Sequence, residues 1–234
     1  MWELILSGGP FMIPLMLCSI VGLGVIIERF RYLNEVVIDN EGLRNKIAAL
    51  VVGGQLRQAE LIVGSTPGPV SAIFDVALRK LRFLIKLEKG GGEVEEGVIK
   101  AMEDHAVHVV ADLERNLVIL ATVINIAPMF GFLGTVTGMI NAFAAIAAAG
   151  GMDASLVAKG IGEALTTTAA GLSVALPCQI AYNYFTSRVQ RFVLDIEESA
   201  AHLIEVLTAS DFDLIVEQVH VTEDAMAEEP VAVS

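Results

Sequence analysis

The chain has 234 residues, and its mean hydropathy is +0.65 because 54% of its residues are hydrophobic and only 18% are charged. Since water-soluble domains usually contain about a quarter of charged residues, this composition predicts a membrane protein. The formal net charge of -13 argues against a nucleic-acid partner, because phosphate backbones are bound by clustered Lys and Arg, which this sequence lacks.

The first apolar segment lies close to the N-terminus. We expect a membrane helix over residues 11–28, preceded by a periplasmic N-terminus of residues 1–10, because the apolar run is long enough to cross a bilayer. No basic residue precedes the run and cations follow it, which favours a retained signal anchor over a cleaved signal peptide. Cys18 in this run and Cys178 in a later one are expected to be free thiols.

The next region, residues 29–116, is predicted to be cytoplasmic and helical, with short amphipathic patterns separated by glycine and proline breakers. After Gly92 the next breaker is Pro128, so one helix is expected to run from this region directly into the second span. The earlier patterns predict helices near residues 40–52, 55–63 and 69–87.

Two longer apolar segments follow, over residues 117–149 and 161–185, with a periplasmic loop of residues 150–160 between them. The first of them would be about 50 Å long as a helix, and a hydrocarbon core is about 30 Å thick, so protein must shelter part of it. The second continues as a cytoplasmic helix over 186–210, and an acidic, disordered tail is expected over 211–234. The predicted fold class is an all-α membrane protein with three transmembrane helices, two of them long and extending into a cytoplasmic helical bundle.

Positive charge predicts the orientation. All of the 15 Lys and Arg residues except Lys159 lie on one predicted side of the membrane. Because Lys and Arg near span ends stay in the cytoplasm, the N-terminus is expected outside and the C-terminus in the cytoplasm.

The second span contains glycines three and four residues apart. Gly131, Gly134 and Gly138 share one helix face, and small residues at this spacing let two helices approach closely. Pro128 removes a backbone hydrogen bond one turn earlier and leaves a carbonyl that can be hydrated. Thr135 lies next to the glycine face. Helix packing alone would explain this face, and pore lining is the second interpretation.

The third span places Glu163 and Thr167 four residues apart on one face near its outer end. Thr168 points about 100° further round the helix, so the polar surface is broad. Gly171 extends a stripe of small residues, and Pro177 is a further candidate for packing or pore lining. Two interpretations stay open: Glu163 snorkels at the headgroup level while the threonines pack against helices, or the carboxylate and hydroxyls line a hydrated ion path.

The expected depth of the threonines in the membrane favours the interpretation as a hydrated ion path. The second and third spans are predicted to be antiparallel, and Thr135 and Thr168 lie at similar distances from the loop that joins them. Their hydroxyls are therefore expected at the same membrane level.

The segments "GFLGTVTGMI" in the second span and "GIGEALTTTAAGLSVALPCQIAYNYF" in the third resemble those of the MotA/TolQ/ExbB proton-channel family. The opening "GGPFMIPLMLCSIVGLGVIIERF" is similar to the first span of the ExbB members, which are the most similar branch. The resemblance covers all three spans, in the right order.

The resemblance implies a proton-conducting pore subunit of a bacterial inner-membrane motor, which couples the proton motive force to mechanical work. It also implies a lipid-embedded homopentamer around an ExbD- or TolR-like single-span partner whose Asp takes and releases the proton, with a TonB-like protein as a further partner. The family motif maps the proton pathway to Thr135, Glu163 and Thr168. The additional Thr166 and Thr167 leave open which hydroxyl lines the path, and proton or sodium coupling also stays open. No cofactor other than the coupling ion is expected.

Other functions are less well supported by the sequence. A non-conducting helical membrane scaffold is the alternative, as is a TolQ- or MotA-type role, since the energised process (nutrient uptake, envelope maintenance or motility) depends on partners. His105 and His108, with Glu103 and Asp104 nearby, could suggest a metal site, but without further ligands solvated histidines on a bundle surface are the favoured interpretation, so no metal site is predicted. No phosphate-binding loop and no catalytic Ser, Cys and His grouping is found, so we do not expect an enzyme.

Overall fold

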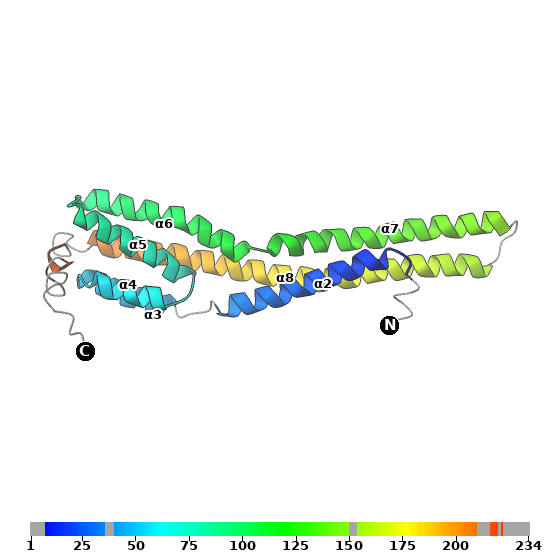
Figure 1. Cartoon of the computed structure of the whole chain (residues 1–234), viewed down its shortest axis with the longest axis horizontal. Coiled ribbons are helices and arrows are strands. Elements are labelled where there is room, and N and C mark those ends of the chain that lie inside the picture. Colours follow the sequence, from blue (N-terminus) through cyan, green and yellow to red (C-terminus); the bar gives the residue numbers. More distant parts are fainter. Residues whose placement is uncertain (1–7, 36–39, 150–153, 210–215, 220, 222–234) are drawn as a thin grey trace, which may run out of the picture. The chain divides into compact units, whose positions relative to one another are not determined.

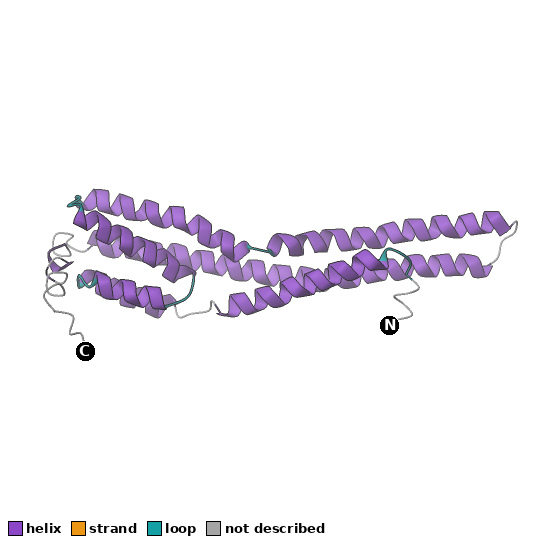
Figure 2. Cartoon of the chain, viewed as in Figure 1, coloured by secondary structure: helices purple, strands orange, loops and turns teal. Residues whose placement is uncertain are grey.

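The computed structural model describes residues 8–35, 40–149, 154–209, 216–219 and 221. Every described element is a helix and none of these residues forms a strand, which confirms the predicted all-α class (Figure 2). The tail predicted over 211–234 lies mostly outside the described residues, and so do residues 150–153 of the loop predicted over 150–160. The helices are α2 (Met12–Glu35), α3 (Asn40–Val52), α4 (Leu56–Ser65), α5 (Pro69–Lys86), α6 (Gly91–Glu114), α7 (Leu117–Ala149) and α8 (Ala154–Ala209), as Figure 1 shows.

Three of these helices are long and apolar enough to cross a membrane. Their candidate spans are Met12–Glu35, Leu117–Ala148 and Val157–Ala209. Helix α8 continues without interruption through the third apolar segment into the amphipathic segment that follows it, as predicted. Two bounds differ from the prediction, because α2 extends beyond residue 28 to Glu35 and α8 begins at Ala154 rather than at residue 161.

The prediction of one helix running into the second span is wrong. Helix α6 ends at Glu114 and α7 begins at Leu117, and between them Asn116 has a positive φ of 64°. This left-handed conformation ends a helix without Gly or Pro, because the short polar side chain of Asn tolerates it. The Asn116 amide Nδ2 also donates a hydrogen bond to Glu28 Oε2 on α2 at 2.9 Å.

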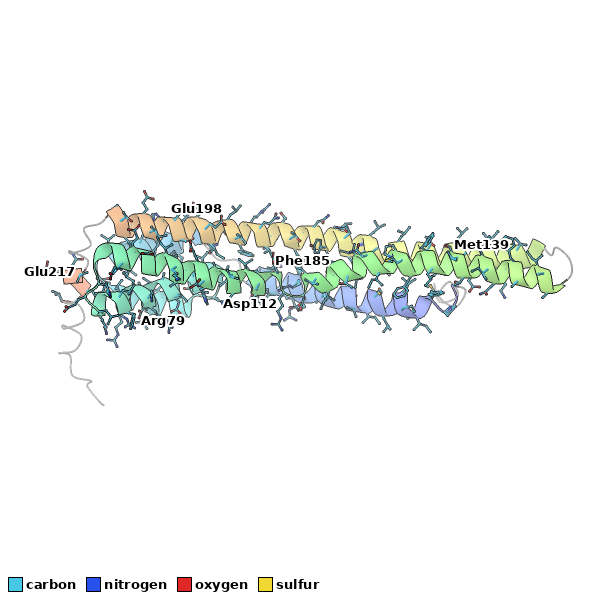
Figure 3. The ribbon with its side chains drawn as sticks, turned by 90° about the horizontal axis from the view of Figure 1, so that it is seen from above. Arg79, Asp112, Met139, Phe185, Glu198 and Glu217 are labelled. Carbon is cyan, nitrogen blue, oxygen red and sulfur yellow. The ribbon has the colours of Figure 1, made fainter. Side chains whose placement is uncertain are left out.

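The chain divides into two compact units. The first comprises Met1–Leu33 and Glu114–Ser187, so it contains α7, the N-terminal part of α8 and nearly all of α2. These three helices share a buried apolar cluster, and α7 and α8 run side by side in opposite directions (Figures 1 and 3). The cluster consists of Met12, Leu15, Ala127 and Ala175, with Cys18, Phe130, Ala170 and Val174 packed against it.

The second unit comprises Asn34–Leu113 and Arg188–Ser234. Helix α5 provides much of the core of this unit, because its apolar residues recur at helical spacing and share one face. The helix begins at Pro69, a position at which the missing backbone N–H of proline has no cost. Ion pairs hold the helices at the surface, with Arg44 to Glu198 at 3.0 Å and Arg82 to Glu60 at 3.1 Å. The second half of α8 buries apolar residues at helical spacing, namely Val189, Phe192, Ile196, Leu203 and Leu207.

Candidate functional site

The glycine face of α7 packs directly on α8. A side chain added at Gly131 would meet the backbone of Thr167 and Thr168, and one added at Gly138 would meet Ala164 at 3.1 Å. In the same way, Gly171 on α8 lies against the Ala127 carbonyl, 2.6 Å from where a Cβ would stand. Glycine at these positions is what allows the two backbones to approach closely enough for polar side chains to reach across.

Thr168 is the residue that reaches across. Its hydroxyl donates a hydrogen bond to the Gly131 carbonyl on α7 at 2.9 Å, and its side chain is half-buried. A membrane offers few alternative partners for either group, so this bond sets the register between the helices. Gly131 precedes Thr135 by four residues, about 6 Å along the helix axis, so Thr135 and Thr168 lie at neighbouring levels.

Thr135 is half-buried, and its hydroxyl donates to the Phe132 carbonyl of its own helix at 2.6 Å. Its hydrogen is thereby used inside α7, while its oxygen keeps lone pairs that can accept a hydrogen bond. Thr166, the first of the three consecutive threonines, likewise donates to its own helix, at Gly162.

Thr167 differs from its neighbours because it is 1% exposed. Its hydroxyl lies 2.6 Å from the Gly8 carbonyl and 2.9 Å from the Glu163 carbonyl, so one hydrogen is shared between two acceptors. Its methyl group fills the space beside Gly134. Among Thr166, Thr167 and Thr168, Thr167 is therefore the one whose hydroxyl faces the interior of the unit.

Glu163 lies one turn of α8 from Thr167 towards the N-terminus of the helix and is half-buried. Its carboxylate occupies the space where a Cβ on Gly9 would stand. Neither α7 nor the stretch of α8 from Ala164 to Ser187 contains Asp, Glu, Lys or Arg. Glu163 therefore stands alone as a carboxylate at the edge of an apolar helix pair.

The two prolines that were predicted to pack or to line a pore differ in their exposure. Pro128 is half-buried in α7 and Pro177 is exposed on α8. Pro128 borders an apolar hollow of about 610 Å³, which is lined by Ile126, Pro128, Met129, Phe130, Phe132 and Leu133.

Sequence reasoning missed the turn that precedes α2. Gly8 and Gly9 contact Thr167 and Glu163, which are more than 150 residues away in the chain. The only local signal was the succession of two glycines and Pro10, which is typical of a turn but does not name the surface it meets. Gly22 was missed as well, and it packs against Cys178 on α8.

Chemically, these residues place hydroxyls, backbone carbonyls and one carboxylate along a tightly packed helix pair in an otherwise apolar unit. Hydroxyls can both donate and accept hydrogen bonds, and a carboxylate can take and release a proton. Such a set is suited to holding water or passing a proton. Because Glu163 is the one carboxylate in this set, a single chain supplies one side chain there that can take and release a proton.

Residues 66–198 match the family described as the MotA/TolQ/ExbB proton channel family. A Tol-Pal system protein TolQ from Pseudomonas aeruginosa is 36% identical over 56% of this chain, and an ExbB-like protein from Synechocystis is 31% identical over 78% of it. A biopolymer transport protein ExbB from Pseudomonas putida is 29% identical over 73% of the chain. The matched regions span 58%, 69% and 51% of these relatives, respectively. On the match over residues 66–198, the chain belongs to the MotA/TolQ/ExbB proton channel family.

Proposed function

We propose that this chain is the pore subunit of a proton-driven inner-membrane motor. Several copies would surround a hydrated path that passes Glu163, Thr135 and Thr168. The observation that chiefly supports the proposal is the lone Glu163 carboxylate beside the α7–α8 contact, with the Thr168 hydroxyl bonded to Gly131 at 2.9 Å. An ionisable group within a membrane helix is expensive to maintain and is generally functional.

The half-buried positions of Thr135 and Thr168 fit a path at the surface of one subunit. Each hydroxyl gives its hydrogen to a backbone carbonyl, so each oxygen is left oriented as an acceptor. A water molecule or a protonated group of another chain can then donate to it. Thr167 stays in the proposal as a residue of the same region, but its burial directs it towards the inside of the subunit.

The path needs a second acid. Because α7 and the middle of α8 contain no Asp, Glu, Lys or Arg, a proton that passes Glu163 meets no further carboxylate of this chain within the span. A single-span partner of the ExbD or TolR type, with an Asp in its helix, supplies that group in the proposed assembly. Transfer of one charge through 100 mV releases about 2.3 kcal/mol, so a few protons suffice to drive a conformational step.

The exposed apolar surface of α7 fits a multimeric assembly in lipid. Val118, Met129 and Phe132 are 76%, 68% and 70% exposed in the single chain. In the membrane such a surface is covered by acyl chains, by further copies or by partner helices. We take a homopentamer with a periplasmic N-terminus and a cytoplasmic C-terminus as the assembly, with a TonB-like protein as the element that does mechanical work.

The test uses the complex as it exists in the cell. The tagged chain is purified from native membranes with its associated proteins, which are identified by mass spectrometry. The complex is then reconstituted into vesicles that contain a pH-sensitive dye, and a potassium diffusion potential is applied. Wild-type complex should acidify or alkalinise the lumen, and Thr135→Val and Glu163→Ala should each lower the rate at least tenfold.

Thr137→Val is the matched control for Thr135→Val. Thr137 is in the same helix and also donates to backbone carbonyls of that helix, at Leu133 and Gly134. It lies two residues further on, which is about 200° round the helix from Thr135. If wild-type rates persist in Thr135→Val and Glu163→Ala complexes of unchanged oligomeric state, the chain is a scaffold and not a conductor.

A further inference from the structure

The Gly8–Gly9 turn, at the start of the described chain, contacts two polar residues of α8, Thr167 and Glu163. Thr167 donates to the Gly8 carbonyl at 2.6 Å, and the Glu163 carboxylate occupies the space above Gly9. We infer that this turn is a positioning element, which covers and orients Glu163 at the outer end of the proton path and is held in place by Thr167. The inference deepens the proposed function and rests on it.

The turn leaves little room for side chains as the neighbouring residues now lie. Gly9 has a positive φ of 70°, which residues with a Cβ rarely adopt, and a Cβ there would collide with Glu163 Oε1. A Cβ on Gly8 would meet Met12 Cγ and Sδ, each at 2.6 Å. The absence of side chains lets the backbone lie directly against Glu163 and Thr167.

The turn is rigidly joined to α2. The Gly9 carbonyl accepts a hydrogen bond from the Met12 amide at 3.2 Å, and the Pro10 carbonyl accepts one from the Ile13 amide at 3.3 Å. Met12 is itself buried in the cluster that α2 forms with α7 and α8. The position of Glu163 is therefore coupled through this turn to the first helix and not only to its own helix.

Thr167 can release the turn without losing its own hydrogen bond. Its single hydrogen lies between the Gly8 carbonyl at 2.6 Å and the Glu163 carbonyl at 2.9 Å, and the second acceptor belongs to α8. When the turn moves away, the hydroxyl bonds fully to α8, whereas the Gly8 carbonyl must find water. This distinguishes Thr167 from Thr168, whose partner lies on α7.

The adjacent threonines provide a matched comparison. Thr166 and Thr167 both donate to an α8 carbonyl, but only Thr167 also contacts the turn. Thr167→Val should therefore free the turn, Thr166→Val should not, and Thr167→Ser should restore wild-type behaviour. Gly9→Ala should displace the turn through its contact with Glu163, and its effect should resemble that of Thr167→Val.

Two measurements on the full-length complex report on the turn without requiring proton transport. The first is modification of Glu163 by a water-soluble carbodiimide with glycinamide, quantified by mass spectrometry. The second is hydrogen–deuterium exchange in the peptide that begins at Gly8. Because a buried carbonyl that loses its donor destabilises the bound turn, Thr167→Val should raise both rates roughly tenfold, which corresponds to about 1.4 kcal/mol. Thr166→Val and Thr167→Ser should stay within about twofold of wild type.

The vesicle assay then separates this inference from the proposed function. If wild-type vesicles conduct, Thr167→Val and Gly9→Ala should change the rate while Thr166→Val does not. Equal Glu163 modification in Thr166→Val and Thr167→Val complexes would overturn the positioning role, whatever the vesicles do. Faster modification with an unchanged proton rate would also overturn it, because the turn would then cover Glu163 without serving the path. If wild-type vesicles do not conduct, the proposed function fails and the turn has no path to serve.

Discussion

The Thr168 hydroxyl on α8 donates to the Gly131 carbonyl on α7, 2.9 Å away and 37 residues apart in the chain. The bond exists because Gly131 has no side chain to keep the backbones apart. It joins the glycine face of one span to the threonine face of the other. The polar residues of the candidate path are therefore positioned by close packing of helix backbones, which makes the path sensitive to substitutions that widen the gap.

Gly134→Val should separate the two helices. A Cβ at Gly134 would overlap the Thr167 methyl and would meet Thr167 Cβ at 2.8 Å, and a branched side chain adds to this overlap. Overpacking of this kind costs about 1 to 3 kcal/mol. Unfolding by increasing SDS in mixed micelles should show that loss, and Gly162→Ala is the control, because no atom lies within 4 Å of a Cβ there. Equal stability of both variants would mean that α7 and α8 are not packed as described.

Thr168→Val should weaken the contact between α7 and α8 by about 1 kcal/mol, because one interhelical hydrogen bond in a membrane protein has roughly that value. Thr168→Ser keeps the donor and should retain most of the stability. The same SDS titration measures both variants. A larger loss for Thr168→Ser than for Thr168→Val would show that the methyl group matters and the hydrogen bond does not.

Phe185→Ala should be among the most destabilising single changes in the first unit. Phe185, which Figure 3 labels on α8, is 1% exposed, so removal of its ring leaves a large cavity. Such a truncation costs about 3 to 5 kcal/mol. Phe132→Ala removes the same group from a position that is 70% exposed in the chain and should cost much less. A similar loss for the two variants, measured in the monomeric state, would contradict the burial of Phe185.

Asn116→Ala should be less stable than Asn116→Gly. Both variants lose the hydrogen bond to Glu28, but only Ala must adopt the left-handed conformation at φ 64° with a Cβ. That conformation costs about 1 to 2 kcal/mol for a residue with a Cβ. Thermal unfolding followed by circular dichroism should rank wild type above Asn116→Gly and Asn116→Gly above Asn116→Ala. The reverse order of the two variants would indicate a continuous helix in solution.

Much of the helical architecture could be predicted. The apolar run over 117–149 coincides with α7, and the breakers at Gly53 and Gly54 and at Pro67 to Pro69 delimit α3, α4 and α5. These features could be predicted because helix propensity and hydropathy depend on residues that are close together in the sequence. The break at Asn116 was not predicted, because a single left-handed Asn is stabilised by a partner on another helix and not by its own sequence neighbours.

The candidate site was predictable in its residue types and not in its contacts. Helical spacing alone placed Gly131, Gly134 and Gly138 on one face, since that spacing is a property of any α-helix. It could not distinguish Thr166, Thr167 and Thr168, which lie about 100° apart and have the same chemistry. Their separate partners are Gly162, Gly8 and Gly131.

By itself, the sequence determined an all-helical membrane chain with one carboxylate and a row of hydroxyls in its third apolar segment, because span length, charge and periodicity are local quantities. Only the tertiary structure decided that Thr168 meets α7 and that Thr167 and Glu163 meet the Gly8–Gly9 turn. Those partners are set by which backbones can approach each other, and that depends on three segments packing together rather than on any one of them.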